Sequence, residues 1–97
     1  MKYSNGIKIK LGDKVKLIMP AGNEIAKIVM LGSNYKHLEL ESNFKVWVLE
    51  NRILKKDSIV VEWIGENPLE HNHPKYSPVG NYMTTAISDD IELLARA

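Results

Sequence analysis

Apolar and lysine residues alternate near the N-terminal end of the chain. Residues 7–11 read Ile-Lys-Ile-Lys-Leu, and residues 14–17 read Lys-Val-Lys-Leu. A period of two is typical of strands with one apolar and one polar face. Either the two runs pair through a three-residue connection, or the first is a lead-in to a fold that begins at Gly12.

The next strand is predicted between two turns. Residues 20–23, Pro-Ala-Gly-Asn, favour a turn because proline presets φ and because glycine and asparagine accept left-handed conformations. The run from Glu24 to Leu31 is too apolar for simple alternation, which predicts a central strand contacted on both faces. Gly32 is expected to end it.

Two further alternating runs, 37–41 and 44–49, predict a hairpin. A three-residue loop between them pairs Leu40 with Val46 and puts both apolar sets on one face. In this register Trp47 lies on the polar face of the hairpin.

The remaining pattern predicts one more strand and a tail. A helical turn at residues 50–53 leads to a last strand over residues 59–64. Three prolines among polar residues then predict irregular chain. Ser88 is a good N-cap for an apolar stripe that starts at Ile91, so a short helix is expected near the C-terminal end. We therefore expect a small β-barrel domain over residues 1–64 and an irregular extension over residues 65–97.

Composition places the chain among small globular proteins. Its 97 residues are 44% hydrophobic, enough for one core. It has no cysteine, so neither a disulfide framework nor a thiolate metal site is expected, and a reducing, cytoplasmic location is the simplest expectation. No apolar run is long enough to predict a membrane span.

Charge is divided unevenly along the chain. Residues 1–57 hold 11 Lys and Arg against 6 Asp and Glu, whereas residues 58–97 hold 2 against 6. The basic part either attracts an anionic partner or is covered by the acidic part.

A family resemblance agrees with this pattern. Residues 12–18, Gly-Asp-Lys-Val-Lys-Leu-Ile, are followed by a glycine-containing turn, by Ala-Lys-Ile-Val at 26–29 and by Leu-Glu-Leu at 38–40. Over residues 12–64 this resembles an SH3-like small barrel of the KOW or Tudor type. The resemblance implies a five-stranded SH3-like barrel. Together with the pattern of the tail, the expected fold is mainly β, with an irregular C-terminal extension and a short C-terminal helix. Proteins of that superfold mostly bind RNA, DNA or other proteins.

Two binding hypotheses follow, and neither involves catalysis. In the first, basic side chains contact the phosphates of DNA or RNA. The candidates are Lys8, Lys10, Lys14, Lys16, Lys45, Arg52, Lys55 and Lys56. Trp47 and Tyr35 are candidate aromatic contacts for a base. Alternatively, the lysines form a solvated face that protects a sheet edge, and Trp47 is covered by the tail.

In the second hypothesis, Trp47 and residues 66–97 bind an intracellular protein, as an interaction or inhibitor module. A homo-oligomer is compatible with both hypotheses, because an exposed sheet edge favours symmetric pairing. Glu66, Glu70, His71 and His73 carry metal-ligating groups, but such loop residues are more often simply polar, and neither a metal nor a cofactor is expected. No phosphate-binding loop signature occurs, and no enzyme activity is predicted.

Overall fold

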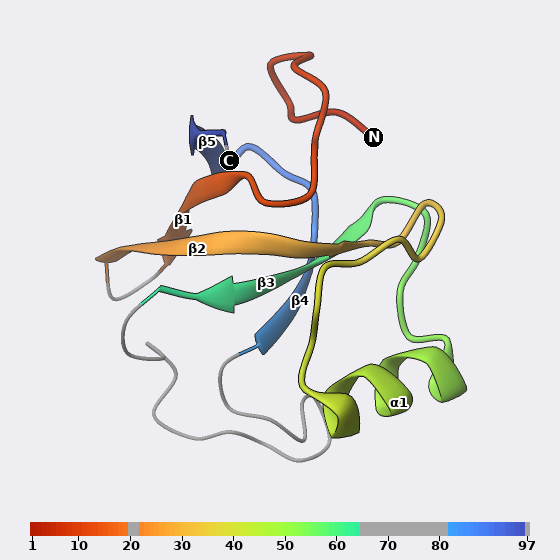
Figure 1. Cartoon of the computed structure of the whole chain (residues 1–97). Helices are drawn as coiled ribbons and strands as arrows, with labels where there is room; N and C mark the ends of the chain where they lie inside the picture. The colour runs from red at the N-terminus through yellow and green to blue at the C-terminus, as the bar shows by residue number, and fades with distance from the viewer. Residues whose placement is uncertain (20–21, 65–81, 97) are drawn as a thin grey trace.

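The computed structural model describes residues 1–19, 22–64 and 82–96, which form one antiparallel sheet and one helix (Figure 1). The elements are β1 (Lys14–Met19), β2 (Gly22–Leu31), α1 (Ser42–Asn51), β3 (Ser58–Trp63), β4 (Tyr82–Ala86) and β5 (Ile91–Ala95). The five strands lie in the order β4-β3-β2-β1-β5. The mainly β prediction is therefore confirmed. In the described part of the chain, no helix is long and apolar enough to cross a membrane.

The first lysine-rich run is a lead-in to the sheet. Gly12, with φ of 90°, forms a turn in which the Asp13 amide donates to the Lys10 carbonyl at 3.2 Å, and β1 starts at the next residue. β1 pairs with β2 along one edge and with β5 along the other. The pairing of residues 7–11 with residues 14–17 was therefore wrong, because both edges of β1 are occupied by other strands.

The turn predicted at residues 20–23 lies partly outside the described residues. Its flanks agree with a tight connection, since Met19 pairs with Gly22 across the β1–β2 hairpin.

Alternation along the strands divides the sheet into two faces. The inner face carries Val15, Ile28 and Val61 and is covered by Tyr3 and Ile9 of the N-terminal segment. The outer face carries the residues between them and is partly covered by α1. Figure 1 shows the N-terminal segment and α1 on opposite sides of the sheet. Coverage on both sides explains the continuous apolar sequence of β2 and confirms that it is a central strand.

β2 contains an irregularity near its end. The register between β2 and β3 shifts between Ile28 and Met30, which makes Val29 the extra residue of a bulge. Gly32 follows the strand and begins a turn, as predicted. The chain then returns beside β2, where the Leu38 amide donates to the Val29 carbonyl at 2.9 Å.

The predicted hairpin at residues 37–49 was wrong, because residues 42–51 form α1. Phe44 and Val48 are four residues apart and both fully buried, so they lie on one helix face against the outer face of the sheet. The Glu41 carboxylate caps the helix by accepting from the Phe44 amide at 3.1 Å. Burial of this face outweighs the strand propensity of its β-branched and aromatic residues, a common effect of tertiary context. The helical turn predicted at residues 50–53 is in fact the end of this helix.

The predicted C-terminal helix was also wrong, because residues 91–95 form β5. A helix of that length is unstable alone, whereas a strand gains backbone hydrogen bonds along β1 and buries Ile91. Ser88 does accept a local hydrogen bond, from the Asp90 amide at 3.2 Å, but it does so in the turn before β5. β4 and β5 show that residues 82–86 and 91–95 belong to the sheet. The segment predicted to be irregular, 65–81, lies outside the described residues.

A buried carboxylate ties the two chain ends to the sheet. Asp13, 1% exposed, accepts from the Tyr3 hydroxyl at 2.6 Å and from the Lys10 amide at 3.0 Å. Arg96 lies 3.7 Å from the same carboxylate and donates to the Lys8 carbonyl at 2.7 Å. These contacts hold the N-terminal segment in place, and with it the residues that line the hollow described below.

Candidate nucleic-acid interface

Two loops pack closely together at the end of the sheet next to α1. The Gly32 amide donates to the Ser58 carbonyl at 2.8 Å, and a side chain at Gly32 would collide with the Lys55 carbonyl. The Tyr35 hydroxyl donates to the Leu54 carbonyl at 2.9 Å. We call residues 32–36 and 52–57 together the loop site.

Two residues of the loop site adopt a conformation that bulky side chains rarely take. Tyr35 has φ of 56° and Arg52 has φ of 49°. The Arg52 guanidinium carbon lies 5.4 Å from the centre of the Tyr35 ring, within cation–π distance. A left-handed backbone costs roughly 1–2 kcal/mol at each residue, and such strain is concentrated at functional sites. Glycine commonly occupies the position of Arg52 at a helix end, yet this helix ends with a cation over an aromatic ring.

The loop site is rich in exposed positive charge. Lys36, Arg52, Lys55 and Lys56 are all exposed, and none of them forms an ion pair within the described residues. By contrast, two lysines of the sheet have acidic partners. Lys16 lies 3.2 Å from Glu92, and Lys27 lies 3.8 Å from Glu62. Lys8, Lys10 and Lys14 are likewise exposed and form no ion pair in the described structure, but the cations of the loop site are grouped on two loops that contact each other.

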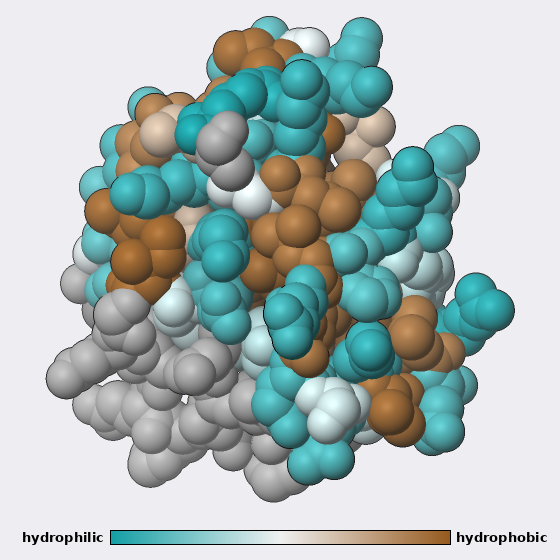
Figure 2. Space-filling model, viewed as in Figure 1, coloured by the Kyte–Doolittle hydropathy of each residue, from teal (hydrophilic) through white to brown (hydrophobic). Residues whose placement is uncertain are grey.

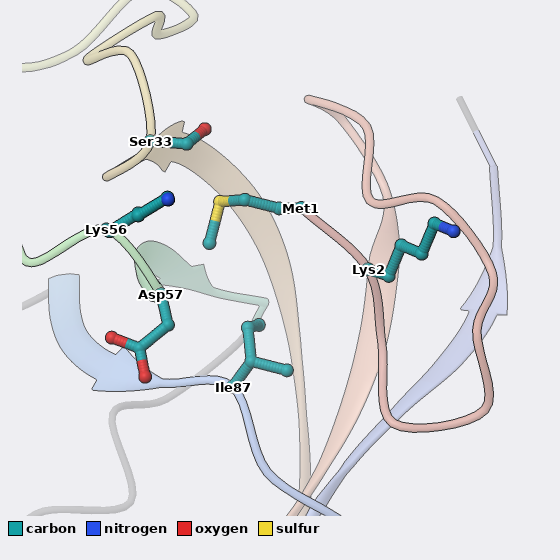
Figure 3. A pocket seen from close by; sticks show the side chains of 6 residues that line it. All are labelled: Met1, Lys2, Ser33, Lys56, Asp57 and Ile87. Atoms are coloured by element: carbon teal, nitrogen blue, oxygen red, sulfur yellow. The ribbon is translucent and has the colours of Figure 1, made fainter.

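A hollow of about 520 Å³ lies between the loop site and the N-terminal segment (Figure 3). Its lining residues are Met1, Lys2, Ser33, Lys56, Asp57 and Ile87. Met1 and Ile87 provide apolar surface in the middle of the view, with Lys56 and Asp57 on one side and Lys2 on the other. A volume of this size lies within the range of small-ligand pockets. The hollow thus combines an apolar surface with cations on both sides.

The structure brings together only some of the residues predicted to contact nucleic acid. Arg52, Lys55, Lys56 and Tyr35 lie in the loop site. Lys8 and Lys10 are exposed on the N-terminal segment, where Lys8 forms an isolated bridge with Lys2.

The other predicted contacts lie elsewhere. Lys14 and Lys16 are on the outer face of β1, and Lys45 is half-buried on α1. Lys2, Lys36 and Ser33 were not predicted, because no local pattern distinguishes them and only the tertiary fold places them beside the other cations.

Trp47 is half-buried against the second core cluster. Its ring centre lies 6.0 Å from that of Phe44, which in turn stacks on Tyr82 at 4.2 Å. Of the C-terminal residues, Tyr82 belongs to this second core cluster, whereas Met83 packs against the first. Other apolar residues of the tail, Leu69, Tyr76 and Val79, lie outside the described residues, as do Glu66, Glu70, His71 and His73. Among the described residues, no three metal-ligating side chains are grouped together.

Comparison with protein-family models, with curated proteins and with solved structures finds no match for this chain.

Proposed function

We propose that the protein binds single-stranded nucleic acid at the loop site, with phosphates beside Arg52, Lys55 and Lys56 and a base in the adjoining hollow. The observation that carries the proposal is the group of exposed cations without acidic partners in the described structure, next to a hollow with apolar lining. Lysine and arginine side chains gain affinity by releasing the counterions of a phosphate backbone.

A single strand suits this site better than a duplex. Proteins that read single strands splay the bases out and hold them on aromatic or apolar surfaces and on arginine planes. Tyr35 with Arg52 above its ring, and the hollow lined by Met1 and Ile87, are surfaces of this kind. The Ser33 hydroxyl and the Asp57 carboxylate also line the hollow, and both groups accept hydrogen bonds from the amino groups of a base.

The SH3-like barrel is retained as a proposal for the fold. β1 to β4 follow one another as neighbours, and β5 returns to the free edge of β1, which is the order expected when a meander curls toward closure. The bulge at Val29 supports it too, because bulges bend strands and increase their twist.

The proposal is tested by fluorescence-anisotropy titration with a labelled single strand of about 12 nucleotides, a length suited to small single-strand binders. Three phosphate contacts predict an affinity about 20-fold lower at ~200 mM than at ~50 mM salt. The variant Lys55→Glu/Lys56→Glu should bind roughly tenfold or more weaker and depend less on salt.

The matched control is Lys10→Glu/Lys14→Glu, which makes the same charge change at two exposed positions away from the loop site. It should retain nearly wild-type affinity. Equal losses of oligonucleotide affinity in the two variants would show that binding depends only on the overall charge of the protein. If the wild type did not bind at low salt, the proposal would be refuted.

A further inference from the structure

The outer face of the sheet is covered over only half of its length. At one end, Val60, Met30 and Tyr82 pack under α1. At the other end, Ile18, Ile25 and Ile64 are 48%, 42% and 49% exposed, and no described residue covers them. Figure 2 shows hydrophobic surface near the β1–β2 end of the sheet as well as over α1.

These three isoleucines, the isoleucine patch, lie on three neighbouring strands or directly beyond them. Ile25 pairs with Lys16, and Ile18 is one pair farther along the same face of β1. The Ile64 amide donates to the Ile25 carbonyl at 3.1 Å, which places Ile64 beside Ile25. A group of exposed aliphatic side chains in adjacent positions of a sheet is typical of an interaction surface, whereas single exposed ones are common everywhere.

Charges of both signs flank the isoleucine patch. The pair Lys16–Glu92 lies toward β5, and the pair Lys27–Glu62 lies toward β3, with all four side chains on the outer face. A surface with an apolar centre and balanced charges is complementary to itself. When two copies meet about a two-fold axis, a lysine of one copy can face a glutamate of the other.

We propose that the isoleucine patch is the contact surface between two copies of this chain. The balance of cations and anions argues for a second copy, because two lysines and two glutamates sum to zero charge and give a nucleic acid no net attraction. The surface is independent of the loop site, which lies at the other end of the sheet.

The size of the patch sets the expected strength of the dimer. A standard interface buries about 800 Å² on each partner, more than three half-exposed isoleucines provide. The stems of the flanking lysines, Lys16 and Lys27, must therefore take part. We expect a dimer that dissociates in the micromolar range rather than an obligate one.

Sedimentation velocity of the full chain tests the proposal over about 5 to 500 μM protein, a range that brackets micromolar dissociation. The wild type should shift with rising concentration from the 11.0 kDa monomer toward twice that mass. Ile18→Thr/Ile25→Thr should remain monomeric. The control Val46→Thr changes a side chain of similar exposure on α1 and should dimerise like the wild type.

A second variant keeps the test decisive if the threonine variant unfolds. Glu62→Lys/Glu92→Lys retains the isoleucines but makes the surrounding charge entirely positive, so two copies repel each other and the protein should be monomeric. Thermal unfolding monitored by circular dichroism identifies any variant that has lost its fold. A wild type that stays monomeric at the highest concentration, or a dimer that survives in a folded variant of either kind, would overturn the proposal.

Discussion

Replacing Gly32 with alanine tests the close contact on which the loop site depends. The added methyl group would collide with the Lys55 carbonyl and lie 2.7 Å from the Ser58 carbonyl. Both are backbone atoms, so no flexible side chain can move aside, and overpacking of this kind costs about 1–3 kcal/mol. Separating the loops also weakens the 2.8 Å bond between the Gly32 amide and the Ser58 carbonyl, for about 1 kcal/mol more.

The total, about 2–4 kcal/mol, is a large part of the ~5–15 kcal/mol that stabilises a typical domain. For a chain of this size it lowers the midpoint of thermal unfolding by roughly 10–30 °C. Urea unfolding followed by circular dichroism measures the free-energy change directly. Oligonucleotide affinity should also fall at temperatures where Gly32→Ala is still folded, because the two loops no longer meet.

Gly6→Ala is the matched control. Gly6 has φ of 88°, and no heavy atom lies within 4 Å of an added Cβ. Alanine at this position therefore costs only about 1 kcal/mol, for the left-handed backbone conformation. If Gly32→Ala destabilised the protein no more than Gly6→Ala, the close approach of the two loops would be refuted.

Two further predictions concern Arg52 and Tyr3. Arg52→Gly relieves the left-handed strain but removes the cation–π contact, so the free energy of unfolding should change by less than about 1 kcal/mol. Oligonucleotide affinity, measured by anisotropy, should fall several-fold. If thermal stability and affinity fell together, the strain would have no separate functional reason. Burial, reinforced by the hydrogen bond to Asp13, raises the pKa of Tyr3 above its ordinary value of about 10. The stability that the neutral hydroxyl provides is therefore present below about pH 10 and is lost as pH rises above it, by up to ~1.4 kcal/mol per pH unit. In urea unfolding, the free energy of unfolding of Tyr3→Phe should decrease less steeply above pH 10 than that of the wild type. If the two proteins showed the same decrease with pH, Tyr3 would not be its source.

The strands near the N-terminal end were predictable because local signals agree there. Alternation, the glycines and the apolar run of β2 all indicate the same elements, and β1, β2 and β3 were found close to their observed bounds. α1 was not predictable by the same means. Phe44, Val46 and Val48 occupy every second position, as in a strand. Glu41 is not among the preferred N-cap residues. Only the structure shows that Phe44 and Val48, four residues apart, share one buried helix face.

Some residues of the loop site were among the candidates from the sequence, and others were not. The positive charges of Arg52, Lys55 and Lys56 predict a contact with phosphates, and this stays a prediction. The contact of Arg52 with Tyr35 depends on two left-handed backbone conformations that neither residue type favours. Lys2 reaches the hollow because Asp13 fixes the N-terminal segment, a long-range effect that no local pattern records.

Amide chemical-shift mapping of the ¹⁵N-labelled protein during titration with a single-stranded oligonucleotide tests the central claim most directly. Binding at the loop site predicts shifts that concentrate in residues 32–36 and 52–57 and leave Lys14–Met19 of β1 nearly unchanged. Shifts centred on β1, or none at a several-fold excess of oligonucleotide in low salt, would contradict it.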